Sequence, residues 1–367
     1  MPERTETGFT DMGKKRVVWI ELLRIAACFG VVVLHAASQH FRDVPVDTFV
    51  WKVSNFYHGI SRFAVACFIM ISGALYLDKK RTWNLKKLWL KNILSVAVAY
   101  VFWQIFYGGY RIVITGNSGR GAVWIVKKML VYVSDAYFHL WYLPMLIGLM
   151  IITPLLWEFV NCKRGKQWEE YLIILFLIFK ILPYTAAYFP LPWINHIKTL
   201  MNTVQPDLVT DFAGYFILGH YLYEYGLPEK LERLVYVLGV IFIAGGIGLC
   251  QWKALKQNSA VQSFYENYTL AAFFWSIAVF LFFRNHIGRI QWSEKKAEII
   301  CYLGGCTFGI YLIHAFFRDI LHRAGFDSMF INNTVIAVPV VAAVIFVTSL
   351  IAVILIRHIP VLKKWIV

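Results

Sequence analysis

The segment from Trp19 to Ser38 constrains this chain most, because it is apolar and long enough to cross a lipid bilayer. About 20 residues, each rising roughly 1.5 Å along a helix, span the hydrocarbon core. The same segment carries Glu21, Arg24 and His35, and ionisable groups inside a membrane are costly, so they usually face a cavity or a partner. Arg24 and His35 are separated by about three helical turns, which places them on one helix face roughly 16 Å apart. We therefore expect the first membrane helix to form the wall of a polar pathway or site.

The composition places the whole chain in the membrane class. Of its 367 residues, 59% are hydrophobic and 16% are charged, whereas soluble domains run nearer half apolar and a quarter charged. The formal net charge of +15 would suit a nucleic-acid partner, but the basic residues stand in short clusters between apolar runs. Clusters of that kind set the orientation of membrane proteins, so a nucleic-acid role is excluded.

The apolar pattern predicts an all-α, polytopic membrane protein with about ten transmembrane helices. The ten segments lie at roughly 17–38, 58–77, 92–110, 140–159, 170–189, 210–226, 234–251, 268–283, 300–320 and 333–356. Lys and Arg are concentrated in the connections on the side of the N-terminus, which favours a cytoplasmic location for both termini. The polar residues 1–13 are expected to be a flexible tail, and 14–367 a single membrane-embedded domain. An amphipathic helix is also expected at 122–134, in an outer loop.

Polar and aromatic side chains from three other segments are expected at the outer depth that His35 reaches. Those of the ninth segment lie at i, i+3 and i+7, on one helix face. Four segments contributing such groups at one level predict a polar chamber. The candidates beside His35 are Arg62 in the second segment, His139 and Trp141 in the fourth, and Tyr311, His314 and Arg318 in the ninth.

The connection 78–91 is strongly basic and holds Trp83 and Trp89 among its Lys and Arg residues, including Lys79, Lys80 and Arg81. Most such cytoplasmic loops only enforce membrane topology. The functional alternative is an anionic ligand approaching from the cytoplasm, such as the phosphates of a nucleotide-bearing cofactor.

Plainer roles for the other polar residues also stay open. Arg24 and Arg62 can anchor in lipid headgroups, and His35 can simply bond a neighbouring helix. Aromatic residues at a membrane interface, such as Trp141, usually form belts.

Neither the cysteines nor the histidines predict a metal site. The six cysteines show no paired spacing and mostly fall in or beside apolar runs, as small packing residues do. The histidines lack ligand spacing along the chain, and no carboxylate pair accompanies them, so no metal is expected.

Four short motifs, in this order and spacing, resemble the membrane-embedded acyltransferase 3 family over nearly the whole chain. They are E-L-L-R-I-A-A-C-F-G-V-V-V-L-H at 21–35, S-R-F-A-V-A-C-F-I-M-I-S-G at 61–73, H-L-W-Y-L at 139–143 and T-F-G-I-Y-L-I-H at 307–314. Within the family, the chain is similar to stand-alone bacterial members that O-acetylate surface glycans, of the enterobacterial common antigen type. It departs from many relatives at Ala66 and Ile69, where they have Pro and Phe, at Thr307, where they have Ser, and at Glu21, where Asp is common.

The resemblance implies an O-acyltransferase of the bacterial cytoplasmic membrane. It would move an acetyl or other short acyl group from cytoplasmic acyl-CoA, most simply acetyl-CoA, to a hydroxyl of a cell-envelope carbohydrate or lipid-linked glycan. In that reaction His35 would be the general base. Arg62, with Trp141 or His314, would stabilise the tetrahedral oxyanion. The donor's phosphates would lie against Arg24, Lys79, Lys80 and Arg81, and further candidates are Glu21, His139, Tyr311 and Arg318.

Two other classes of protein remain as alternatives. Polytopic proteins with intramembrane charges are often transporters, here of a small polar or anionic solute, with a site near the bilayer midplane. No repeated halves are visible, and the polar groups gather at the outer level, which argues against that class. The third class is a sensor or scaffold that kept the fold and lost the chemistry.

Overall fold

The computed structural model describes residues 10–11, 14–15, 17–117, 119–189, 199 and 211–366. Within these residues the regular secondary structure is helical apart from one short antiparallel pair, in which β1 (Thr10–Asp11) pairs with β2 (Lys14–Lys15). The all-α prediction is therefore confirmed. Part of the predicted tail, at 1–9 and 12–13, lies outside the described residues, so the division into a tail and one domain stays a prediction.

The helices follow one another with short connections. Their bounds are α1 (Val18–Ala37), α2 (Phe49–Ile60), α3 (Phe63–Tyr76), α4 (Leu85–Lys87), the π-helical η1 (Leu88–Ile93), α5 (Leu94–Ile114), α6 (Ala122–Ser134), α7 (Tyr142–Asn161), α8 (Gly165–Phe176), the π-helical η2 (Leu177–Ile181), α9 (Leu182–Ala186), α12 (Phe212–Glu224), α13 (Glu229–Gln257), the 3-10 turn η3 (Ser263–Tyr265), α14 (Leu270–Asn285), the 3-10 turn η4 (Ile287–Arg289), α15 (Glu294–Arg323), α16 (Thr334–Arg357) and α17 (Pro360–Trp365).

Eight helical stretches in the described part of the chain are long and apolar enough to cross a membrane. They are α1, α2 with α3, α4 through α5, α7, α13, η3 through η4, α15 and α16. The protein is therefore a multi-pass membrane protein. The amphipathic helix expected at 122–134 is α6.

The predicted number of about ten spans is higher than the eight that meet these criteria. The two segments that fall short, 170–189 and 210–226, are helical but differ from a simple span. The run from α8 to α9 contains Glu169, Glu170 and Lys180. Helix α12 has 13 residues, about 20 Å at the α-helical rise, which is shorter than the hydrocarbon core.

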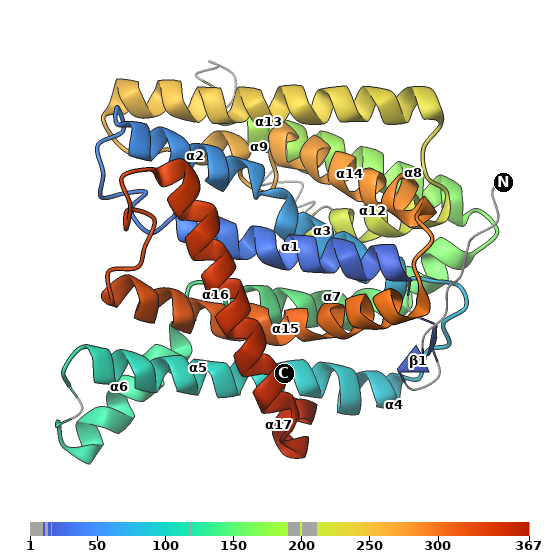
Figure 1. Cartoon of the computed structure of the whole chain (residues 1–367). Coiled ribbons are helices and arrows are strands. Elements are labelled where there is room, and N and C mark those ends of the chain that lie inside the picture. The colour runs from blue at the N-terminus through green and yellow to red at the C-terminus, as the bar shows by residue number, and fades with distance from the viewer. Residues whose placement is uncertain are drawn as a thin grey trace.

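The long helices lie side by side, with α16 crossing α1 and α15 at a steep angle (Figure 1). Helix α1 is central, because it packs against α3, α15 and α16. Helices α3 and α12 approach so closely that a Cβ added at Gly73 would lie 1.7 Å from the carbonyl oxygen of Phe216. Gly73 therefore has a packing role, since any larger residue would separate the two helices.

Candidate active site

One internal cavity of about 170 Å³ runs along α1 and is bounded by α3, α7 and α15. Arg24 and His35 both line it, so the polar face predicted on the first helix opens into a single space. A volume of this size holds about five or six waters at roughly 30 Å³ each, enough for a small reacting group. The rest of the wall comes from Val31, Val65, Phe68, Ser72, His139, Trp141, Tyr142, Leu146, Thr307, Phe308 and Tyr311.

A charge pair fixes the Arg24 end of the cavity. The Arg24 guanidinium donates to both carboxylate oxygens of Glu21, at 3.0 and 2.8 Å, and the Glu21 side chain is buried. Glu21 fits because α15 has Gly304 opposite it: a Cβ there would lie 2.1 Å from the Glu21 Oε2 atom. Both hydrogen bonds come from one guanidinium nitrogen, Nη1, so the pair holds that end of the guanidinium beside Glu21.

Three imidazoles meet at the other end of the cavity. The rings of His35 and His314 stack with centroids 5.2 Å apart, and those of His139 and His314 meet edge to face at 5.0 Å. His314 is fully buried on α15, and His139 is 2% exposed just before α7. His35 and His139 both line the cavity, but His35 is the only one of the three rings that is not buried, so it is the best placed to meet a bound molecule.

Backbone carbonyls fix the two buried rings. The Nδ1 atom of His314 lies 2.6 Å from the Tyr311 carbonyl oxygen, and the Nε2 atom of His139 lies 3.3 Å from that of Leu312. A carbonyl only accepts, so each of these nitrogens carries the proton and the other nitrogen holds the lone pair in the neutral ring. Burial lowers the pKa of His139 well below its usual range, and the neighbouring His314 acts in the same direction, so this ring is neutral. The Tyr311 hydroxyl donates to the His139 carbonyl and fastens this segment to α15.

Two further predicted residues border this cluster. The Arg318 guanidinium lies over the Phe138 ring, 4.7 Å from its centroid, and Phe138 in turn packs against His35. Trp141 lines the cavity, is 39% exposed and stacks on Phe212 at 5.6 Å. The structure therefore brings Arg318 close to His35 through Phe138, and it places Trp141 on the wall of the same cavity.

Arg62 lies in a neighbouring polar cluster. It stands at the junction of α2 and α3, and it is not among the described residues that line the cavity. Its guanidinium lies 3.3 Å from the His58 Nδ1 atom and donates to the Gln262 side chain at 3.2 Å. It also lies over the Tyr265 ring, 5.3 Å from the centroid.

The basic loop contacts the end of α3, where Arg81 lies against Tyr76. The guanidinium of Arg81 lies over the rings of Tyr76 and Trp83, at 4.3 and 4.6 Å from their centroids. Tyr76 lies about one helical turn beyond Ser72, which lines the cavity. Lys79 pairs with Glu224 at 3.2 Å on the surface.

Sequence reasoning missed three polar residues of the cavity wall: Ser72, Tyr142 and Thr307. Ser72 and Thr307 belong to sequence signals that could have found them, the Ser-Gly pair of α3 and the T-F-G-I-Y-L-I-H motif. Tyr142 follows Trp141 directly, and it was not predicted as a site residue because aromatic residues are generally abundant at membrane interfaces.

Comparison with known proteins supplies the family. Neither the curated proteins nor the solved structures include a significant match to this chain. The family model of the acyltransferase 3 acyltransferase domain, however, matches residues 17–357, from the residue before α1 to the last residue of α16. This match includes all eight candidate spans and every residue that lines the cavity. The chain therefore belongs to the acyltransferase 3 family of membrane-embedded acyltransferases.

Proposed function

We propose that this protein transfers an acetyl or other short acyl group from cytoplasmic acyl-CoA to a hydroxyl of a cell-envelope carbohydrate. The observation that carries the proposal is the single cavity lined by both Arg24 and His35, in a chain of an acyltransferase family. A guanidinium at one end can donate hydrogen bonds to the arm of the donor, and a histidine at the other suits removal of a hydroxyl proton.

The donor approaches from the Arg24 end. Its nucleotide is far larger than a cavity of about 170 Å³, so only the thin thioester arm fits inside. The phosphates therefore stay outside, where Lys79, Lys80 and Arg81 offer positive charge. Arg24, oriented by Glu21, contacts the arm as it enters.

His35 then acts as general base on the acceptor. Its ring accepts the hydroxyl proton while the hydroxyl oxygen attacks the thioester carbonyl carbon and forms a tetrahedral intermediate. Collapse of that intermediate forms the ester and breaks the carbon–sulfur bond, and the imidazolium of His35 returns the proton to the departing CoA thiolate. Catalysis of this kind contributes about 10²–10⁴-fold.

The oxyanion of the intermediate needs a hydrogen-bond donor on the cavity wall. We assign this role to the indole N–H of Trp141, because Trp141 lines the cavity while the Arg62 guanidinium is held by His58 and Gln262. His314 positions the His35 ring by stacking on it, and its own ring is held by the Tyr311 carbonyl.

Envelope glycans of a deletion strain test the proposal. The strain is complemented with the native protein, with His35→Ala, or with His358→Ala, which changes an exposed histidine at the end of α16. Mass spectrometry should find an added acetyl or acyl mass with the native protein and His358→Ala, and none with His35→Ala at equal membrane abundance. Identical glycans in all strains, together with solute flux through the protein, would instead support a transporter.

A further inference from the structure

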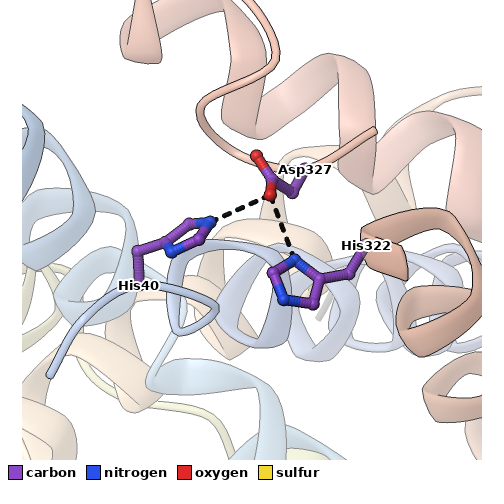
Figure 2. Close-up of side chains that lie close together, drawn as sticks. All are labelled: His40, His322 and Asp327. Atoms are coloured by element: carbon purple, nitrogen blue, oxygen red, sulfur yellow. Dashed lines mark hydrogen bonds and ion pairs between the residues drawn. The ribbon is translucent and has the colours of Figure 1, made fainter. Parts of the chain in front are cut away.

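A second cluster of chemically active side chains lies outside the cavity, where α1 and α15 both end. His40 follows the end of α1, His322 is in the last turn of α15, and Asp327 lies in the connection to α16. The Asp327 Oδ2 atom lies 3.0 Å from the His40 Nε2 atom and 3.0 Å from the His322 Nδ1 atom (Figure 2). One carboxylate oxygen therefore lies between two imidazoles from separate parts of the chain.

These three groups have the spacing and the chemistry of a metal-ligand set. Their donor atoms all lie within 4.8 Å of one another. Tetrahedral zinc with bonds of 2.0–2.2 Å needs ligand atoms about 3.3–3.6 Å apart, so only small shifts of the three side chains are needed. Two imidazole nitrogens and one carboxylate oxygen suit Zn²⁺ or a similar transition metal, whereas Ca²⁺ and Mg²⁺ prefer oxygen ligands throughout.

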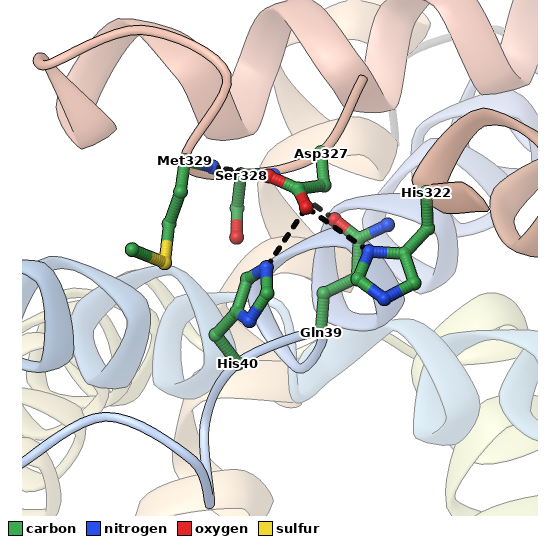
Figure 3. Close-up of polar contacts among 6 residues, drawn as sticks. All are labelled: Gln39, His40, His322, Asp327, Ser328 and Met329. Atoms are coloured by element: carbon green, nitrogen blue, oxygen red, sulfur yellow. Dashed lines mark hydrogen bonds and ion pairs between the residues drawn. The ribbon is translucent and has the colours of Figure 1, made fainter. Parts of the chain in front are cut away.

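A backbone amide holds the Asp327 carboxylate in place, and two polar side-chain atoms nearby have no hydrogen-bond partner among the described residues. The second oxygen of Asp327 accepts a hydrogen bond from the Met329 amide at 2.8 Å, and the Ser328 amide donates to the Gln39 side-chain oxygen at 3.1 Å (Figure 3). Ser328 is fully buried, yet neither its hydroxyl nor the Gln39 side-chain nitrogen has a partner among the described residues. Unpaired buried polar atoms are uncommon, so a site completed by an ion and its bound water would account for them.

We propose that His40, His322 and Asp327 bind a Zn²⁺ ion, with a fourth position open to water. The two facing nitrogens would then turn their lone pairs to the metal, and each neutral ring would carry its proton on the other nitrogen. The side chains of His40, His322 and Asp327 are 20%, 41% and 14% exposed, so an ion reaches the site from solvent.

The site would tie together the ends of the two helices that carry the stacked histidines of the cavity. His40 follows His35 closely on the chain that leaves α1, and His322 lies about two turns beyond His314 on α15. A bound ion would restrain the relative position of these helix ends. The role proposed is structural, and it does not depend on the reaction at His35.

Metal analysis of the purified protein tests the proposal. The protein carries a tag without histidine, is purified in detergent, stripped with a chelator and then equilibrated with ZnCl₂. We expect close to one zinc per chain and a higher melting temperature than the stripped protein shows, because a ligand bound only by the folded state stabilises it. Removal of one ligand by His40→Ala or His322→Ala should weaken zinc binding by at least about 10-fold, as even outer-shell changes do.

Two matched variants distinguish a bound metal from hydrogen bonding within the cluster. Asp327→Asn keeps the shape and the hydrogen-bonding reach of the side chain but loses the anionic ligand, so its zinc binding should also weaken. His358→Ala removes an exposed histidine away from the site and should retain the bound zinc. Equal zinc content in all monodisperse variants, or none in the native protein, would overturn the proposal and leave the three residues as a hydrogen-bonded group only.

Discussion

The imidazole of His35 stacks on that of His314, with ring centroids 5.2 Å apart and planes inclined by 25°. The Nδ1 atom of His314 is hydrogen-bonded to the Tyr311 carbonyl oxygen. Within the described residues, no hydrogen bond is made by either nitrogen of His35. One ring is thus fixed and the other is supported on a face but left open to the cavity. This arrangement suits a base that must bind and release a proton during each turnover.

Replacement of His35 by Ala should lower kcat for acyl transfer by about 10²–10⁴-fold, because the hydroxyl proton loses its acceptor. The KM for acyl-CoA should change little, since the donor binds at the Arg24 end of the cavity. The measurement is transfer of labelled acetyl from acetyl-CoA to an envelope glycan extract. His358→Ala is the matched control, and near-native kcat in His35→Ala would exclude His35 as the base.

Gly304→Ala should raise the KM for acyl-CoA and leave the chemical step nearly intact. The new methyl group would lie 2.1 Å from the Glu21 Oε2 atom, so the Glu21 side chain must shift, which disturbs its pairing with Arg24. A hydrogen bond to a charged group contributes about 1.5–3 kcal/mol, which corresponds to a rise of about 10-fold or more in KM. Steady-state kinetics with varied acyl-CoA measure it.

The control for this change is Gly248→Ala on α13. A Cβ there meets nothing within 4 Å, so both kinetic constants should stay native. A native KM in Gly304→Ala would show that the Glu21–Arg24 pair does not orient the donor.

Helical periodicity is the reason that part of the site could be predicted from the sequence. Arg24 and His35 lie on one face because whole turns separate them, and the structure opens that face into one cavity. His314 and Tyr311 follow from the same rule on α15. A pattern along one helix carries this information locally, without knowledge of its neighbours.

Contacts between distant segments could not be predicted in the same way. Arg62 was expected at the depth of His35, but at the turn between α2 and α3 its guanidinium contacts His58 and Gln262. The histidine spacing offered no reason to expect a metal, since His40 and His322 lie at opposite ends of the chain and meet only because α1 and α15 end together. Apolar composition alone does not report helix length, and among the described residues eight helical stretches are long and apolar enough to span, while α12 has only 13 residues.

Charge removal in the basic loop should weaken donor binding more at Arg81 than at Lys79. The Arg81 guanidinium lies over the rings of Tyr76 and Trp83 and is therefore already ordered, whereas Lys79 is a surface residue paired with Glu224. Arg81→Gln should therefore raise the KM for acyl-CoA more than Lys79→Gln, with kcat unchanged in both. Lys163→Gln, in another exposed basic cluster, is the control. Equal, native KM values in all three would leave the loop as a signal for membrane orientation.

Trp141→Phe and Arg62→Lys together identify the group that stabilises the oxyanion. Phenylalanine keeps an aromatic ring against Phe212 but lacks the indole N–H, so kcat should fall by about 10²–10³-fold. Lysine at position 62 keeps the positive charge but loses the planar contact with His58 and Gln262, so its main effect should be a lower melting temperature. Trp252→Phe, an exposed tryptophan on α13, controls for the loss of an indole. The opposite outcome is a fall in kcat of about 10²–10³-fold in Arg62→Lys at a native melting temperature. Such a protein would be stable and would have lost only the geometry of the guanidinium. Arg62 would then be the group that stabilises the oxyanion.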